Sequence, residues 1–177
     1  MQNNVLYKKF IFSSDLKVLK NMDFIIINGP LGVLSLDIPK LLNLYKIDGN
    51  LVLSAKFANK SLFFTFTSLI KQKIKGVTLG FFEILVINGT GWRVISEKSN
   101  QLVFKLGFSH DIVYFVPKNI EVFVIDKQTF KIFSLDLECL HQFISIVCSL
   151  KKFDLYKGKG IRKLHCPVVL KLSSKSK

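Results

Sequence analysis

The chain has 177 residues, of which 49% are hydrophobic and 21% charged, a composition typical of a folded protein and not of a disordered one. Its 26 basic and 12 acidic residues give a formal net charge of +14, which favours a polyanionic partner, either nucleic acid or an anionic membrane surface. No apolar run approaches the ~18 residues of a membrane-spanning helix, so we expect no membrane span.

Lysine dominates the basic residues, with 24 Lys against 2 Arg. Residue types with A+T-rich codons (Phe, Tyr, Met, Ile, Asn and Lys) make up 75 of the 177 residues, which indicates an A+T-rich genome, such as that of an organelle or a biased bacterium. Because codon bias raises the lysine count, the placement of the lysines is more informative than their number. Residues 151–177 hold nine basic residues and one acidic residue, so this short tail carries +8 of the net charge.

The beginning of the chain is expected to be an N-terminal extension, residues 1–20, that is neither a signal peptide nor a transit peptide. Residues 21–77 are expected to form a small α+β domain. Runs of β-branched and aromatic residues predict its strands at Phe24–Ile27, Val33–Leu36 and Leu51–Lys56. Apolar residues then recur every three or four positions from Leu62 to Ile74, which predicts a helix that stops at Gly76.

A second α+β domain is expected over residues 78–153, followed by a basic tail over residues 154–177. The same kind of run predicts strands at Phe82–Ile87, Trp92–Ser96, Leu102–Leu106, Ile112–Val116, Glu121–Ile125 and Phe130–Phe133. A helical period from Leu137 to Cys148 predicts a second helix, with Asp136 as its N-cap. Each domain is therefore expected to be an antiparallel β-sheet packed against one α-helix.

An internal echo favours two related domains. Residues 24–29 and 83–89 are both apolar runs that end in Asn-Gly, a hairpin turn signal. A weaker echo pairs residues 47–50 with residues 125–128, each in front of a strand. Because strands and helix recur in the same order, we interpret the chain as a tandem duplication.

The tail contains a run, Asp154–Lys163, in which glycines alternate with lysines. Glycine lets the backbone bend and brings bare N–H groups close to phosphate oxygens, while Lys157 and Lys159 supply charge. Arg162 adds a planar donor, and Tyr156 is placed either to stack on a base or to dock on the core. Composition alone favours a solvated basic tail over a phosphate-binding one.

The run resembles the C-terminal signature of the large-subunit ribosomal protein L-six (uL-six) family, Tyr-Lys-Gly-Lys-Gly followed by an aliphatic residue. Further segments resemble that family in the same order. They are Gly76–Phe81, Gly89–Arg93 and Leu106–His110. The chain departs from the family at Phe153, where a small residue or Pro is usual, and at Trp92, where Tyr is commoner.

The resemblance implies two tandem α+β domains and a structural role in the large ribosomal subunit, without enzyme activity, cofactor, metal or small-molecule substrate. It implies large-subunit ribosomal RNA as partner, beside the sarcin–ricin loop and the factor-binding region, with neighbouring ribosomal proteins. The implied RNA-binding residues are Tyr156, Lys157, Gly158, Lys159, Gly160, Arg162, Lys163, Trp92, Arg93 and His110. Trp92 and Arg93 have packing and ion pairing as equally good alternatives. The composition favours a mitochondrially encoded member, with a plastid or the bacterial cytoplasm as alternative locations.

Other functions fit the sequence less well. Cys139, Cys148 and Cys166 show no paired spacing, which indicates a reducing compartment and no zinc site. Ser109, His110 and Asp111 are neighbours in sequence, but no motif marks a nucleophile. The alternative is a basic module outside the ribosome that binds a membrane surface or an acidic partner, with the lysines of the first helix on anionic lipid.

Overall fold

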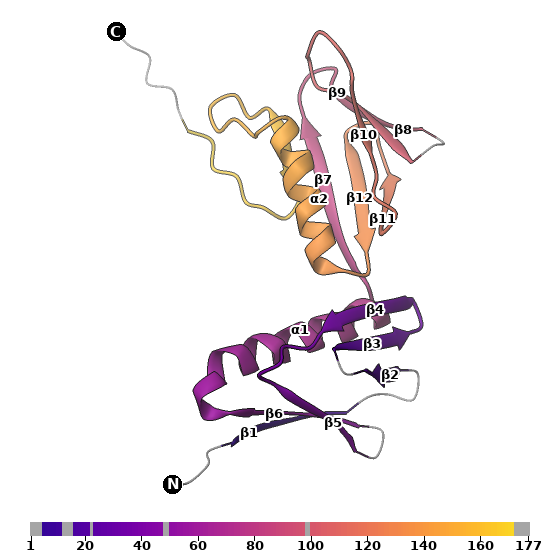
Figure 1. Ribbon diagram of the computed structural model, residues 1–177. Helices are drawn as coiled ribbons and strands as arrows, with labels where there is room; N and C mark the ends of the chain where they lie inside the picture. Colours follow the sequence, from indigo (N-terminus) through magenta and orange to yellow (C-terminus); the bar gives the residue numbers. More distant parts are fainter. Residues whose placement is uncertain (1–4, 12–15, 22, 48–49, 98–99, 172–177) are drawn as a thin grey trace. The chain divides into compact units, whose positions relative to one another are not determined.

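The computed structural model describes residues 5–11, 16–21, 23–47, 50–97 and 100–171. The chain divides into two compact units, residues 1–80 (unit 1) and residues 81–177 (unit 2). Both units combine antiparallel sheets with one long helix (Figure 1). None of the helices in the described ranges is long and apolar enough to cross a membrane.

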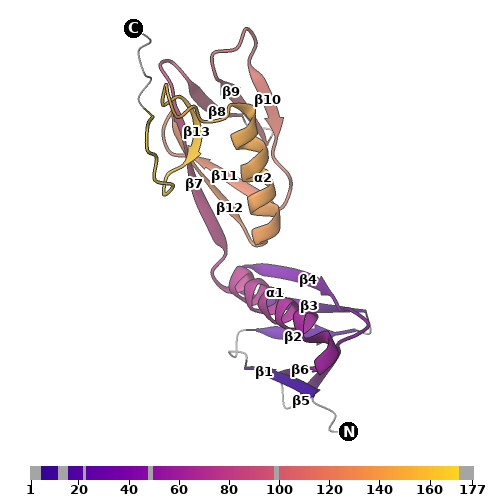
Figure 2. The same ribbon diagram turned by 90° about the vertical axis from the view of Figure 1, so that its left-hand side faces the viewer.

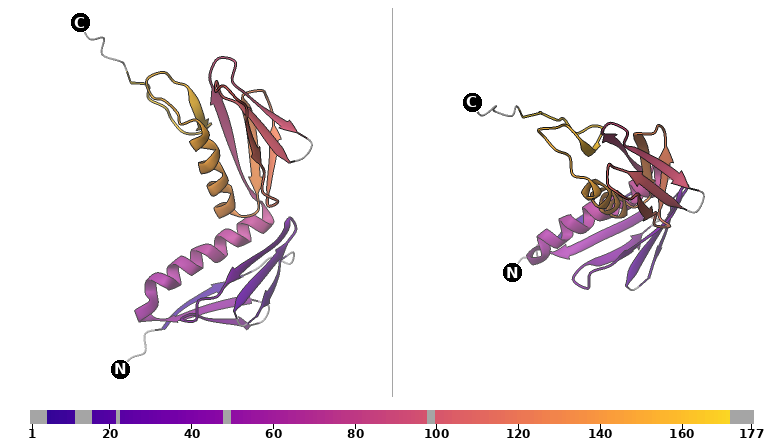
Figure 3. Two further views of the ribbon diagram at one scale, coloured as in Figure 1. Left: turned by 45° about the horizontal axis from the view of Figure 1, so that its top comes forward. Right: turned by 90° about the horizontal axis from the view of Figure 1, so that it is seen from above.

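Unit 1 consists of two three-stranded sheets and one helix. In chain order its elements are β1 (Val5–Phe10), β2 (Lys17–Lys20), β3 (Phe24–Gly29), β4 (Gly32–Asp37), β5 (Asn43–Ile47), β6 (Asn50–Lys56), a 3-10 turn (Phe57–Asn59) and α1 (Lys60–Thr78). The sheets have the strand orders β1-β6-β5 and β2-β3-β4. The apolar stripe of α1, including Phe66 and Ile70, is buried with Ile25, Leu51 and Leu53 of the strands in one core (Figure 3).

Unit 2 has the same plan with one extra strand. Its elements are β7 (Phe81–Asn88), β8 (Arg93–Glu97), β9 (Gln101–Lys105), β10 (Ile112–Phe115), β11 (Ile120–Val124), β12 (Thr129–Ser134), α2 (Leu137–Leu150) and β13 (Gly160–Lys163). The strand orders are β11-β12-β7-β13 and β10-β9-β8. Phe104, Phe130 and Phe143 are buried between the strands and α2.

The strand orders show which elements correspond. The sheet β1-β6-β5 matches β7-β12-β11, the sheet β2-β3-β4 matches β8-β9-β10, and a helix follows β6 and β12 alike. The predicted α+β fold of two tandem, related sheet-plus-helix domains is thus confirmed. The stronger sequence echo was wrong in its alignment, because it paired β3 with β7, whereas β3 corresponds to β9. The weaker echo joins the equivalent hairpins β5–β6 and β11–β12, although Asp48 and Gly49 lie outside the described residues.

The helix ends test the predicted caps. Asp136 is the N-cap of α2, and its Oδ1 accepts a hydrogen bond of 3.2 Å from the N–H of Glu138, as predicted. Gly76 is not the stop of α1 but a buried residue inside the helix. The helix ends at Thr78. Gly80, two residues later, has a φ of +70° in the left-handed region, and its N–H donates to the Gly76 carbonyl at 3.0 Å.

Both ends of the chain contribute strands to these sheets. Within the residues expected as an N-terminal extension, β1 pairs with β6 and β2 pairs with β3. Within the expected tail, β13 pairs antiparallel with β7. The boundary between the units follows Gly80, three residues after the position expected from sequence.

Candidate nucleic-acid interface

The segment from Asp154 to Lys159, here called the Gly/Lys loop, is closed by its own hydrogen bonds. The Asp154 N–H donates to the Lys159 carbonyl, and the Asp154 carbonyl accepts from the Gly158 N–H, each at 2.8 Å. The Asp154 side chain adds a third bond, in which Oδ1 accepts from the Tyr156 N–H at 2.8 Å. Gly158 has a φ of +65°, a conformation that favours glycine. The loop thereby holds its backbone in place while Lys157 and Lys159 are exposed.

Strand β13 anchors this loop to the sheet. Gly160 lies opposite Asn88 of β7, and the side chain of Ile161 is 2% exposed in the core. A Cβ atom on Gly160 would lie 2.4 Å from the Cα of Phe153, so the chain returns to the sheet through a gap that only glycine fits. The glycine of the motif at this position therefore serves the fold.

Trp92 lies in a slot made by two further glycines of the sequence motifs. A Cβ on Gly89 would lie 2.3 Å from Cδ2 of Trp92, and one on Gly107 would lie 2.8 Å from its Nε1. The Nζ of Lys151, at the end of α2, is 5.4 Å from the Trp92 ring centroid and 4.1 Å from that of Phe108. The packing alternative considered for Trp92 is thus present, and it also positions a lysine.

Three of the four segments singled out in the sequence gather at one end of unit 2, whereas Gly76–Phe81 spans the end of α1 and the start of β7. Residues 89–93 follow β7, residues 106–110 connect β9 to β10, and the Gly/Lys loop follows α2 and precedes β13. Trp92 joins the first two segments, and the pairing of Gly160 with Asn88 brings the third beside the first. Figures 1 and 2 show the ends of β7 and α2 on the same side of the unit. We call this end, with its exposed lysines, the basic end.

Arg93 and His110 are exposed at this end. Arg93 is opposite Lys105 in the β8–β9 register, and Lys105 forms an ion pair of 2.9 Å with Asp111. The ring of His110 has its Nδ1 3.5 Å from the Ser109 hydroxyl. Because Asp111 pairs with Lys105, the three neighbouring residues do not form a catalytic triad.

Two predicted contacts have partners inside the protein. The guanidinium of Arg162 donates from Nη1 to the carbonyls of Lys163, Leu164 and Cys166 at 3.3–3.4 Å, and its Nε is buried without a hydrogen bond. Lys163 has its Nζ 3.9 Å from a carboxylate oxygen of Glu83. Arg162 therefore stabilises the turn after β13, whereas the long, partly exposed ion pair of Lys163 with β7 contributes little to stability.

Sequence reasoning missed two lysines of the basic end. Lys151 follows the predicted second helix and belongs to none of the motifs, so only the fold shows its cation–π contacts with Trp92 and Phe108. Lys127 lies exposed in the β11–β12 turn, where its carbonyl accepts from the Val94 N–H at 2.8 Å, next to Arg93. Only the pairing of the strands reveals this second lysine, because nothing in its local sequence distinguishes it from other turn lysines.

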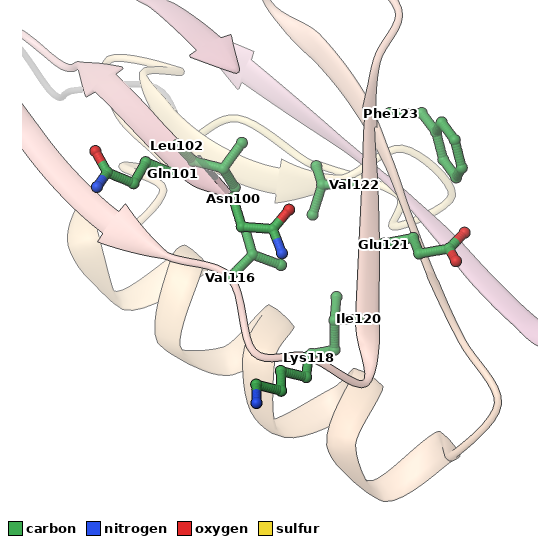
Figure 4. Close-up of a pocket in the computed structure, with 9 residues that line it drawn as sticks. All are labelled: Asn100, Gln101, Leu102, Val116, Lys118, Ile120, Glu121, Val122 and Phe123. Atoms are coloured by element: carbon green, nitrogen blue, oxygen red, sulfur yellow. The ribbon is translucent and has the colours of Figure 1, made fainter. Parts of the chain in front are cut away.

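Unit 2 also contains a hollow and three cysteines. A hollow of about 420 Å³ lies between β11 and the neighbouring ends of β9 and β10, and its lining contains no histidine, cysteine or serine (Figure 4). No group of three or more His, Cys, Asp or Glu side chains within the described ranges is placed to hold a metal ion. Burial raises the pKa of the Cys148 thiol, which therefore stays neutral.

Comparison with known proteins gives relatives that match most of the chain. No protein-family model matches the chain. The large ribosomal subunit protein uL6 of Dictyoglomus thermophilum is 34% identical over 148 residues, which is 81% of each chain. The uL6 protein of Limosilactobacillus reuteri is 30% identical over 160 residues, covering 88% of this chain and 89% of the relative. The protein uL6c of Porphyra purpurea is 34% identical over 142 residues, 78% of each chain.

Proposed function

Because the chain belongs to the uL6 family of large ribosomal subunit proteins, we propose that it binds large-subunit ribosomal RNA through the basic end of unit 2. The chain is a structural protein of the large ribosomal subunit. The observation that carries the proposal is the Gly/Lys loop, in which three internal hydrogen bonds fix the backbone while two lysines remain exposed. A loop of fixed shape binds phosphates at fixed positions, which suits the recognition of a folded RNA by its shape.

The neighbouring side chains support the same surface. Lys151 is held over two aromatic rings, and Lys127 and Arg93 lie exposed beside Trp92. Tyr156 is 62% exposed, so it is available to stack on a base or a ribose instead of packing into the core. We assign direct RNA contacts to Lys157, Lys159 and Tyr156, and a supporting role to Gly160.

The partner RNA is proposed to be the region beside the sarcin–ricin loop, close to the landing site of translation factors and to neighbouring ribosomal proteins. The ribosome concerned is proposed to be mitochondrial, because 24 lysines against 2 arginines indicate an A+T-rich genome. Sedimentation of lysed mitochondria tests this. The protein should travel with the large subunit and be released when ribonuclease degrades the RNA. A protein that stays at the top of the gradient in both runs would overturn the ribosomal proposal.

The salt dependence of binding tests the site itself. A contact with ~4 phosphates gives a slope of about −3 for the logarithm of affinity against the logarithm of salt concentration. The double variant Lys157→Ala/Lys159→Ala should flatten this slope by about one to two units. Lys118→Ala is the matched control, because Lys118 is equally exposed but lies in the β10–β11 connection, outside the basic end. An unchanged slope in the double variant would remove the Gly/Lys loop from the interface.

A further inference from the structure

The basic end accounts for only part of the positive charge. Residues 1–80 contain eleven lysines and four acidic residues, a formal net charge of +7, while residues 81–150 have a net charge of −1. Unit 1 therefore carries about as much positive charge as the tail that the proposed function uses. Charge of this size on a small unit attracts a polyanion of its own.

The lysines of unit 1 are concentrated on particular strands. The four strands β1, β2, β5 and β6 contain no acidic residue and six lysines, which are Lys8, Lys9, Lys17, Lys20, Lys46 and Lys56. Two of these lysines tie the edges of the two sheets together. Lys20 donates to the carbonyl of Leu44, and Lys46 donates to the carbonyl of Val18 at 3.1 Å. Lys20 of β2 and Lys46 of β5 thus both lie where the edges of the two sheets meet.

The register of the β1-β6-β5 sheet places two tyrosines on the face opposite the core. Lys9, Val52 and Tyr45 lie in one row across the three strands. Tyr7 is two residues from Lys9 along β1, on the same face, and lies opposite Ser54. Directly opposed residues of antiparallel strands share a face. The alternate positions, such as Leu51 and Leu53, are buried in the core with α1. The face that carries the two tyrosines is therefore the one directed away from the core.

The exposed fractions agree with that assignment. Tyr7 is 69% exposed and Tyr45 is 51% exposed, although both are large rings on a regular sheet. The Nζ of Lys20 is 5.9 Å from the centroid of the Tyr45 ring. From strand spacing and rise, the two tyrosines are about 12 Å apart, so they address different bases. This surface, made of Tyr7, Lys9, Tyr45 and Val52, is called the tyrosine face below.

We propose that the tyrosine face is a second RNA contact, which takes unpaired bases of an RNA loop or bulge on Tyr7 and Tyr45 while Lys9 and Lys20 hold the phosphates. The inference rests on the proposed function, because it assigns a further surface to the same class of partner. Aromatic rings on an open sheet stack with bases of any identity, and lysines beside them bind the backbone.

The outer sheet face of unit 2 is a useful comparison, because it has exposed aromatic rings but also a carboxylate. There Phe82 is 59% exposed and Phe123 is 53% exposed, but Glu121 lies on the same face, in the row of Phe133 and Phe82. A carboxylate in that row repels phosphate. The tyrosine face, whose strands carry no carboxylate, is the one of the two that fits an RNA.

Binding of the full-length chain to a transcript of the large-subunit ribosomal RNA tests the proposal. Tyr7→Leu and Tyr45→Leu should each weaken binding roughly 5- to 100-fold, without changing the salt slope, because stacking releases no counterions. Lys9→Ala should reduce the slope by about one unit. Phe82→Leu is the matched control, an equally exposed ring on the other sheet face, and should leave affinity unchanged. Thermal unfolding of each variant checks that the fold is retained.

A photo-crosslinker in place of Tyr45, in large subunits assembled with that variant, identifies the occupant. Crosslinks to RNA support the proposal, whereas crosslinks to a protein alone, or none at all, overturn it. The two proposals fail separately. If Lys157→Ala/Lys159→Ala flattens the slope while the tyrosine variants bind normally, the second contact is wrong and the proposed function stands. If neither set changes binding, the proposed function itself is wrong.

Discussion

Replacing Gly160 by alanine separates a role in the fold from a role in RNA binding. Gly160 belongs to the Gly/Lys motif, and the sequence alone offers it as an RNA contact. In the structure an added Cβ would lie 2.4 Å from the Phe153 Cα, 2.7 Å from the Lys152 carbonyl oxygen and 2.8 Å from the Phe153 nitrogen. All three atoms are backbone, so no side-chain rotation relieves the overlap. The variant has to separate the start of β13 from the backbone of Lys152 and Phe153.

The magnitude follows from the backbone conformation and from what β13 buries. Gly160 has a φ of +141°, and holding an L-residue in such a sparsely populated region costs about 1–3 kcal/mol. Displacing the strand also exposes Ile161, now 2% exposed, which costs about 1.5–3 kcal/mol. The free energy of unfolding should therefore fall by about 2.5–6 kcal/mol.

Chemical denaturation measures this loss, and amide exchange locates it. The N–H of Ile161 donates to the Lys151 carbonyl at 3.0 Å and that of Leu164 to the Ile84 carbonyl at 2.9 Å, so both amides should lose protection in Gly160→Ala. Gly91→Ala is the matched control, because Gly91 has a φ of +77° but no atom within 4 Å of its Cβ position. It should cost only about 1–2 kcal/mol. Equal losses in the two variants would refute the close packing, and a stable Gly160→Ala that binds RNA weakly would return Gly160 to the interface.

Two further outcomes follow from the same unit. Gly107→Ala should lower stability by more than 1 kcal/mol, measured by thermal unfolding, because its φ is +73° and the added Cβ would lie 2.8 Å from Trp92 Nε1; tryptophan fluorescence should change with it. Burial raises the pKa of Cys148, so iodoacetamide at pH 8 should label exposed Cys166 well before Cys148. Equal labelling rates of the two cysteines would contradict the burial of Cys148. The pKa of Cys148 is higher in the folded than in the unfolded state, so its contribution to stability is complete below the unfolded pKa of about 9. This contribution is lost as the pH rises through the folded-state pKa.

The strands that the sequence failed to predict share a position in the fold. They are β1, β2, β5 and β13, and each lies at the edge of its sheet. The central strands β3, β6, β7, β9 and β12 were all predicted. An edge strand packs against one neighbour and buries fewer side chains, and lysines there protect the open edge. In β2, for example, Val18 is buried between exposed lysines, which gives too short an apolar pattern to recognise.

The candidate site shows a similar division. The motifs single out four segments, and the structure brings three of them to one end of unit 2. The role of each residue depends on the direction in which its side chain points, and the residue type does not determine that direction. Lys159 is exposed, while Lys163, four residues later, lies near Glu83. Arg162 turns onto the carbonyls of its own turn, and only the position of β13 beside β7 decides this.

The duplication explains why the two units present their charge differently. Strand β7 of unit 2 corresponds to β1 of unit 1, and β13 occupies the edge of β7 that has no counterpart strand on β1 among the described residues. In unit 2 the chain's own tail therefore fills this edge, and in doing so it fixes the Gly/Lys loop. In unit 1 the corresponding strand itself carries Tyr7, Lys8 and Lys9. In the two proposals, one copy contacts phosphates through an added loop, whereas the other presents an aromatic and basic sheet face, and two such different surfaces suit two different features of a folded RNA.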